Sequence, residues 1–191
     1  TDGGLYFTEQ GETLKRFNSL DGQGLKYLMS AGVQPVVITG RDSEPLRVRL
    51  QALGIVHAHF GVHDKRAVAE QVLKELNLRF DQAAAMGDDW PDLPVMRLCA
   101  LAAAPAQAHA EVLAKAHWVS LRRGGDGAAL QFHRRGLRGW RARRGGAGAD
   151  PGDPVRGMGL AAVGARIRLA GAAQARRGGR SHADTRGHSP R

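Results

Sequence analysis

Short apolar runs alternate with amphipathic stretches from residue 33 to residue 121, and this alternation limits the possible folds more than any other feature. The runs VQPVVIT at 33–39 and ALAAA at 100–104 are uncharged and of strand length, and a stretch with helical spacing of apolar residues follows each one. Strands that alternate with helices form right-handed βαβ units. The sequence therefore predicts an α/β fold, a three-layer Rossmann-like parallel sheet with helices on both faces.

The same reading gives an order of elements along the chain. LYFTEQGETLKRFN at 5–18 is typical of a β-hairpin that turns at Gly11. We expect strands at 33–39, 55–60, 83–86, 100–104 and 117–121, and helices at 19–32, 43–54, 65–78, 90–99, 106–116 and 124–132. Asp21 is the expected N-cap of the first helix, and Ser43 is that of the second.

The basic residues in excess lie at one end of the chain. Residues 1–130 contain 14 Lys and Arg against 15 Asp and Glu, whereas residues 131–191 contain 14 Arg against 3 Asp. Residues 131–191 also include 13 Gly and 11 Ala, and they hold too few large apolar residues to offset the entropy lost on ordering. We therefore expect a domain at 1–130 and a mostly disordered tail at 131–191, with a weak helix near 160–175.

Two origins are open for this tail. Its Arg, Gly, Ala and Pro are encoded by GC-rich codons, so a shifted reading frame would give such a composition. A genuine nucleic-acid-binding tail usually interleaves aromatic residues, but Trp140 is the only aromatic residue after Phe132. The composition favours the shifted frame, so nucleic acid is not the expected partner, and any such binding would be confined to the tail.

Cysteine usage and hydropathy point to a reducing compartment. The single cysteine, Cys99, excludes an internal disulfide and is expected to be a buried free thiol. No apolar run reaches the roughly 18 residues that a membrane helix needs. The chain opens on TDGG, without a basic and apolar leader. These features favour a cytoplasmic protein with no membrane partner.

Side chains that suit a phosphate and a cation follow three predicted strands. Thr39 and Arg41 follow the strand at 33–39, Lys65 follows the next strand and a short loop, and Asp88 and Asp89 follow the strand at 83–86. Ligands of parallel sheets bind beyond the carboxyl ends of the strands. Hydroxyl, guanidinium and ammonium groups bind phosphate, and one or two carboxylates hold Mg²⁺ together with a substrate phosphate.

Taken singly, each of these residues has a structural interpretation. Thr39 is also typical of a strand-end cap, Lys65 of the start of a solvated helix, and the paired acids Asp88 and Asp89 of helix caps. The agreement of three separate strand ends favours a site for a phosphate and Mg²⁺.

Two other motifs were weighed against this site. His57, His59 and His63 have an HxHxxxH spacing that is conceivable for zinc, but only Asp64 stands beside them as a further ligand, so strand and loop histidines are the favoured interpretation. The segment GGDGAA at 124–129 lacks the GxGxxG fingerprint, so a dinucleotide site is not expected.

Four stretches of the chain resemble the 3-deoxy-D-manno-octulosonate 8-phosphate phosphatases, in the cap-less branch of the haloacid dehalogenase superfamily. The stretches are TDGGLYFTEQGETLKRFNSLDGQGLK, VVITGRDSEPLRVRLQALGI, GVHDK and MGDDWPDLPVM, and they keep the family's order within residues 1–130. The resemblance implies a phosphatase domain without a cap domain and a β-hairpin insert near the N-terminus. It also implies hydrolysis of a phosphorylated sugar acid for lipopolysaccharide synthesis, and homotetramers whose hairpins pack together.

The resemblance further implies roles for individual residues. Thr39 and Lys65 match phosphate-binding catalytic positions, Asp88 matches a Mg²⁺ ligand, and Asp89 matches a supporting acid. The positions that match contacts to the sugar-acid phosphate are Asn18, Ser19, Leu20, Asp21, Gly22, Lys26, Arg41, Arg49 and Lys65. Lys26 stands where some members have Arg, which keeps the charge and loses the planar fork.

The chain departs from the family at its start. The family's first motif is Asp-x-Asp-Gly-x-x-Thr-Asp-Gly on the central strand, and this chain begins at Thr1-Asp2-Gly3. The nucleophilic aspartate and the acid–base aspartate would lie upstream. We therefore expect an N-terminally truncated member with its central first strand missing and no appreciable phosphatase activity. A non-catalytic pseudoenzyme or a basic-tailed nucleic-acid-binding module is the alternative.

Overall fold

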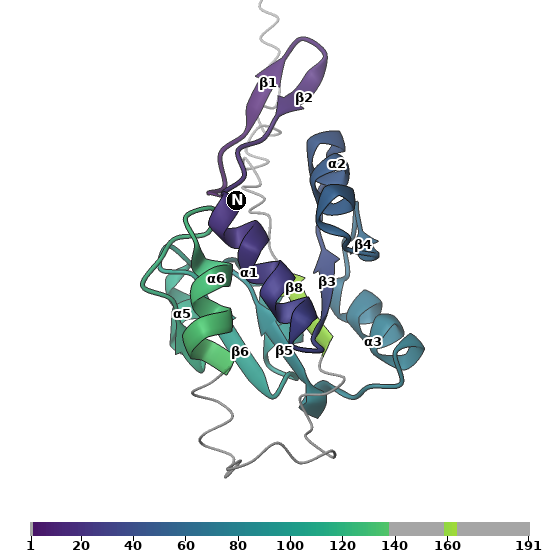
Figure 1. Ribbon diagram of the computed structural model, residues 1–191, viewed down its shortest axis with the longest axis vertical. Helices are drawn as coiled ribbons and strands as arrows, with labels where there is room; N and C mark the ends of the chain where they lie inside the picture. Colours follow the sequence, from purple (N-terminus) through teal and green to yellow (C-terminus); the bar gives the residue numbers. More distant parts are fainter. Residues whose placement is uncertain (1, 138–158, 164–191) are drawn as a thin grey trace, which may run out of the picture.

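The computed structural model describes residues 2–137 and 159–163, which form an α/β structure with a projecting hairpin (Figure 1). The hairpin is a two-stranded antiparallel sheet, and the main sheet has six strands. The strands are β1 (Tyr6–Thr8), β2 (Gly11–Leu14), β3 (Gln34–Ile38), β4 (His57–His59), β5 (Ala83–Met86), β6 (Leu101–Ala104), β7 (Trp118–Val119) and β8 (Gly159–Val163).

The six strands of the main sheet lie in the order β4-β3-β8-β5-β6-β7, and every neighbouring pair is parallel. The helices between the strands are α1 (Ser19–Ser30), α2 (Glu44–Leu53), α3 (Lys65–Glu75), α4 (Leu93–Met96), α5 (Ala110–Lys115) and α6 (Ala128–Gln131). Two 3₁₀ turns, η1 (Phe80–Gln82) and η2 (Trp90–Asp92), and a π-helical turn, η3 (Phe132–Leu137), complete the described elements. The predicted α/β class is confirmed.

The alternation of side chains along β3 shows how the layers are built. Val36 and Ile38 belong to a core cluster with buried residues of α3, α4 and α5, whereas Val37 packs against the cluster of α2 that contains Leu50 and Leu53. Successive strand residues point to opposite faces of a sheet. Helix α1 covers the same face as α2, because Leu25 of α1 packs both against the cluster of Leu28 and Ala84 and against the cluster of α2. Helix α6 packs beside α1 (Figure 1). The predicted three layers are therefore present.

The centre of the main sheet differs from expectation. The strand expected to be missing is the family's first strand, upstream of Thr1. Its position at the centre of the sheet is taken by β8, which lies between β3 and β5, and Ala161 is paired with Val36 on one side and with Ala85 on the other. Residues 160–163 therefore form a strand, whereas a weak helix was expected from residue 160. A strand pairs through backbone N–H and C=O groups, which the facing edges of β3 and β5 would otherwise leave unpaired. The predicted disorder of the remaining tail residues, 138–158 and 164–191, lies outside the described residues.

The N-terminus of α1 also differs from expectation. Asn18, not Asp21, is the N-cap, and its side chain accepts a hydrogen bond from the backbone N–H of Leu20. Asp21 lies in the first turn of α1 and accepts hydrogen bonds from the backbone N–H groups of Gly127 and Ala129.

The hairpin exposes two large apolar side chains. Phe7 and Leu14 are 62% and 61% exposed, respectively. The expected role of the hairpin in a homotetramer stays a prediction.

The single thiol behaves as expected. Cys99 is a free, buried cysteine, as predicted. Among residues 2–137 and 159–163, no helix has the length and apolar character needed to cross a membrane.

Candidate functional site

A cavity of about 190 Å³ lies at the carboxyl end of the main sheet, where α1, α2, β3 and β5 meet. Thr39, which follows β3, and Asp88, which follows β5, both line it. The other polar or charged residues that line it are Lys15, Asn18, Asp21, Arg49 and Gln107. The cavity thus lies at the edge of the sheet where the sequence predicted a phosphate site.

The loop after β3 presents a hydroxyl group to this cavity. Thr39 is 2% exposed, and its Oγ1 accepts a hydrogen bond of 3.2 Å from the backbone N–H of Arg41. A hydroxyl that already accepts a hydrogen bond still has its own O–H to donate. Arg41 does not line the cavity, and its Nη1 lies 3.6 Å from Oε2 of Glu12 in the hairpin.

Lys65 and Asp92 form a buried ion pair behind the acidic loop. Lys65 Nζ lies 2.6 Å from Asp92 Oδ1, and the two side chains are 4% and 1% exposed. Asp92 Oδ2 accepts hydrogen bonds from the backbone N–H groups of Asp88 and Asp89, at 2.9 and 3.1 Å. Burial raises the pKa of Asp92 to about 6, although the charge of Lys65 acts to lower it. The pair therefore fixes the backbone that carries the predicted metal ligands.

Backbone hydrogen bonds connect the three strand-end loops. The carbonyl oxygen of Thr39 accepts from the N–H of Val62, three residues before Lys65, and the carbonyl oxygen of Asp88 accepts from the N–H of His109. Together with the Lys65–Asp92 pair, these bonds bring the predicted residues Thr39, Lys65 and Asp88 into one network. Lys65 is part of this network but does not line the cavity.

The first turn of α1 and the second turn of α2 form the opposite wall. A Cβ at Gly22 would lie 2.4 Å from Arg49 Nη2, so the absence of a side chain at position 22 leaves space for the guanidinium group. Ser19 and Leu20 are exposed and do not line the cavity, and Lys26, two turns into α1, is also exposed away from it. Of the residues predicted to contact the sugar acid, Asn18, Asp21, Gly22 and Arg49 share the cavity.

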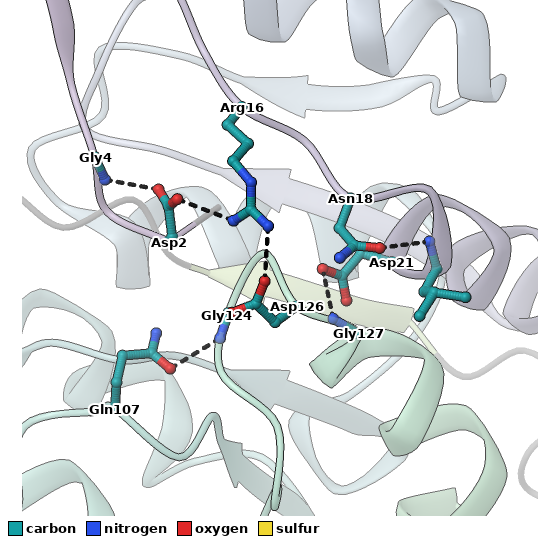
Figure 2. Close-up of polar contacts among 10 residues, drawn as sticks. Asp2, Gly4, Arg16, Asn18, Asp21, Gln107, Gly124, Asp126 and Gly127 are labelled. Carbon is teal, nitrogen blue, oxygen red and sulfur yellow. Dashed lines mark hydrogen bonds and ion pairs between the residues drawn. The ribbon is translucent and has the colours of Figure 1, made fainter.

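Figure 2 shows how α1 and the hairpin hold the loop before α6. Asp21 accepts hydrogen bonds from the N–H groups of Gly127 and Ala129, at 3.2 and 2.8 Å. Arg16 bridges Asp2 and Asp126, with N···O distances of 3.1 and 2.9 Å (Figure 2). Both carboxylate oxygens of Asp21 are thus engaged with the start of α6, so the glycine-rich segment at 124–129 forms part of the wall.

The fit of a divalent cation to these residues rests on Asp88. Asp88 lines the cavity, whereas Asp89 Oδ1 accepts a hydrogen bond of 2.8 Å from the N–H of Trp90 and caps η2. In the described part of the chain, no group of three or more His, Cys, Asp or Glu is arranged to hold a metal ion. This leaves the zinc interpretation of the three histidines without support. One carboxylate is compatible with Mg²⁺, which keeps several waters and takes substrate phosphate as a ligand.

Two residues near the site were not among the predicted site residues. Asp92 was expected only in the first turn of a helix, and its pairing with Lys65 spans 27 residues. Lys15 was assigned only to the hairpin, yet it lines the cavity and is 8% exposed. For Asp92 the available signal was a third acid close behind Asp88 and Asp89; for Lys15 no local pattern indicates the cavity.

The sequence profile of the haloacid dehalogenase-like hydrolases matches residues 59–131. This match runs from the last residue of β4 to the end of α6, and it includes Lys65 and the loop of Asp88 and Asp92. The class of protein defined by the fold and the cavity is therefore that of the haloacid dehalogenase-like hydrolases.

Similarity to individual proteins assigns the chain to one family within the haloacid dehalogenase-like hydrolases. The 3-deoxy-D-manno-octulosonate 8-phosphate phosphatase of Yersinia pestis is 41% identical over 131 residues, which are 69% of this chain and 70% of the relative. The crystal structure of the phosphatase of that name from the same organism has a TM-score of 0.70 at 37% identity, covering 78% of this chain and 80% of the other.

A second crystal structure carries ligands. The Moraxella catarrhalis phosphatase of the same name, in complex with a magnesium ion, a phosphate ion and a KDO molecule, has a TM-score of 0.69 at 29% identity. It covers 72% of this chain and 79% of the other. The chain belongs to the family of 3-deoxy-D-manno-octulosonate 8-phosphate phosphatases.

Proposed function

We propose that this chain binds 3-deoxy-D-manno-octulosonate 8-phosphate in the cavity and derives from a Mg²⁺-dependent phosphatase that releases phosphate from it during lipopolysaccharide precursor synthesis. The observation that carries the proposal is that Thr39, Arg49 and Asp88 line one cavity. Their hydroxyl, guanidinium and carboxylate groups suit a phosphate and a hard cation. The family relationship and the ligands of the Moraxella protein support the same substrate class.

The geometry gives each residue a part in binding. Thr39 Oγ1 donates to a phosphate oxygen, because the hydrogen bond that it accepts from Arg41 N–H leaves its own O–H proton free. Lys65 neutralises Asp92 and holds the Asp88 loop in place. Asp88 would hold Mg²⁺, which when bound neutralises negative charge on the phosphate. Arg49 faces the same cavity and is suited to a second anionic or hydroxyl group of the sugar acid.

We also propose that the 191-residue chain binds without turnover. Within the described residues, the carboxylates that line the cavity belong to Asp21 and Asp88, and Asp21 is engaged with α6. The central strand β8 is followed in the sequence by GARIRLAGAAQARR at 164–177, which contains no Asp or Glu. A nucleophilic carboxylate at the end of the central strand is therefore not supplied by this segment.

Calorimetric titration and a phosphate-release assay test both parts. We expect 3-deoxy-D-manno-octulosonate 8-phosphate to bind the full chain more tightly with Mg²⁺ than with a chelator, and the Mg²⁺ effect to disappear in Asp88→Asn. We expect no phosphate release above that of buffer. A wild-type chain that does not bind the compound refutes the substrate proposal, and Mg²⁺-dependent release refutes the absence of turnover.

The assembly and the tail need separate measurements. We propose a cytoplasmic homotetramer with hairpin contacts, supported by the exposed apolar side chains of Phe7 and Leu14. A monomeric mass in sedimentation would contradict it. RNA binding with a steep salt dependence would instead favour the basic-tailed nucleic-acid module, because counterion release accompanies phosphate neutralisation.

A further inference from the structure

A cluster of charged groups joins the hairpin to the loop after β3. Lys15 Nζ lies 2.6 Å from Glu12 Oε1 and donates a hydrogen bond of 3.4 Å to Ser43 Oγ. Ser43 Oγ in turn donates to Glu12 Oε1 at 3.1 Å, and Arg41 Nη1 lies 3.6 Å from Glu12 Oε2. The Lys15 and Glu12 side chains are only 2% and 9% exposed. Ser43 is the N-cap residue of α2, as predicted, but its side chain makes no cap hydrogen bond and binds the hairpin instead.

The charges in this cluster do not balance. Two cations, Lys15 and Arg41, share the single carboxylate of Glu12. Although burial acts to raise the pKa of Glu12, Lys15 and Arg41 hold that pKa below its usual value, so the carboxylate stays ionised. One positive charge is left over. The Arg41 side chain is 24% exposed, whereas the Lys15 ammonium group is poorly solvated, so a second anion is favourable beside Lys15.

Lys15 is the member of the cluster that reaches the cavity. It lines the cavity together with Thr39, Arg49 and Asp88, whereas Glu12, Arg41 and Ser43 do not. An ammonium group has three donors, and Glu12 and Ser43 take two of them. The third donor is suited to an anionic oxygen of a ligand in the cavity.

We propose that Lys15 binds the carboxylate of the sugar acid, an inference that rests on the proposed function. Thr39 and Asp88 follow β3 and β5 and suit the phosphate and its cation, while Lys15 enters from the hairpin side with the surplus charge. A ligand with a phosphate at one end and a carboxylate at the other would use both. Glu12 acts through Lys15 and is a positioning residue.

Affinities of the full chain for four compounds test this assignment. The compounds are 3-deoxy-D-manno-octulosonate 8-phosphate, the same sugar acid without phosphate, glucose 6-phosphate, and inorganic phosphate. For Lys15→Met we expect about tenfold weaker binding of the two carboxylate-bearing compounds and a change of less than about twofold for the two others. Circular dichroism checks the fold, and Lys15→Gln, which keeps a donor, serves if Lys15→Met does not fold.

Two matched variants separate a ligand contact from a loosened hairpin. Lys115→Met removes an exposed ammonium group of α5, which does not line the cavity, and is expected to leave all four affinities within about twofold. Glu12→Gln loosens the same hairpin contact but keeps the ammonium group, so it should lose less affinity for the carboxylate compounds than Lys15→Met does.

The outcomes distinguish this inference from the proposed function. Equal losses in Glu12→Gln and Lys15→Met, or a loss in Lys15→Met for all four compounds alike, would overturn the assignment of Lys15 while the proposed function stands. A wild-type chain that binds neither sugar-acid compound overturns both together.

Discussion

Removing either member of the Lys65–Asp92 pair should destabilise the protein strongly, and removing both should cost less than the sum. The two side chains are almost fully buried and lie 2.6 Å apart. Leaving one charge of a buried pair without its partner costs about 3–5 kcal/mol. Asp92→Asn creates this situation for Lys65. The double variant Lys65→Met/Asp92→Asn leaves no charge at this buried site, and the amide oxygen introduced at position 92 can still accept from the N–H groups of Asp88 and Asp89.

The stability of the single variant Lys65→Met should depend on pH more steeply than that of the wild type. Without Lys65, burial should keep Asp92 protonated at neutral pH, since its pKa is about 6 even beside the ammonium group. A carboxyl whose folded pKa is raised favours folding as the pH falls, because the folded state then binds a proton that the unfolded state releases. Between pH 7 and pH 5, release of one full proton on unfolding adds about 2.7 kcal/mol of stability, and a pKa of about 6 gives about half of this in the wild type.

Urea unfolding followed by circular dichroism, in the presence of a chelator, measures both effects. We expect a coupling free energy of about 3 kcal/mol in the double-mutant cycle at pH 7. We also expect Lys65→Met to gain about 1.4 kcal/mol more than the wild type between pH 7 and pH 5. Additive single changes, together with parallel pH dependences, would show that the pair does not exist as a buried ion pair.

Three further predictions concern packing. Gly24→Ala should destabilise the protein by about 2 kcal/mol, because the new Cβ would lie 2.5 Å from the backbone nitrogen of Leu130. As a control, Gln23→Ala at the exposed neighbouring position should change the free energy of unfolding by less than about 0.5 kcal/mol. Iodoacetamide at pH 9 should leave Cys99 unmodified in the folded protein and modify it in urea, because burial raises the pKa of the thiol to about 12. Rapid modification without urea would contradict this prediction. Gly22→Ala should weaken binding of the sugar-acid phosphate several-fold with little loss of stability, because the new methyl group displaces the flexible end of the Arg49 side chain. Unchanged affinity would count against a role for Arg49 in binding.

The sequence could predict the parts of the fold that depend on local pattern. The uncharged runs at 33–39 and 83–86 gave the positions of β3 and β5, and the carboxyl-end rule then placed Thr39 and Asp88 at one edge, where they line the same cavity. Lys65 could also be placed near this edge, since it begins the helix after β4. The chemical roles of these residues remain predictions.

Pairings over long sequence distances could not be predicted. The carboxylate of Asp21 has the position of a cap for α1, but it binds N–H groups 106 and 108 residues away. Asn18, three residues earlier, satisfies α1 instead. By local criteria, both Asn18 and Asp21 are suited to cap α1. Only the packing of α1 against α6 determines that Asp21 binds the start of α6 instead. Lys15 illustrates the same limit, because its cavity exists only once the hairpin meets the loop of Ser43.

Strand β8 shows where an argument from composition stops. A segment rich in Gly, Ala and Arg cannot bury enough side-chain area to fold as a unit, and that argument applies to the average over residues 131–191. It does not apply to five residues that pair along both edges, because their pairing satisfies backbone groups of β3 and β5 that would otherwise be buried without partners. The stabilisation therefore comes from backbone pairing within the sheet, and GLAAV needs only side chains small enough, and a backbone extended enough, to fit between β3 and β5. The requirement for a strand at this position therefore comes from the flanking domain.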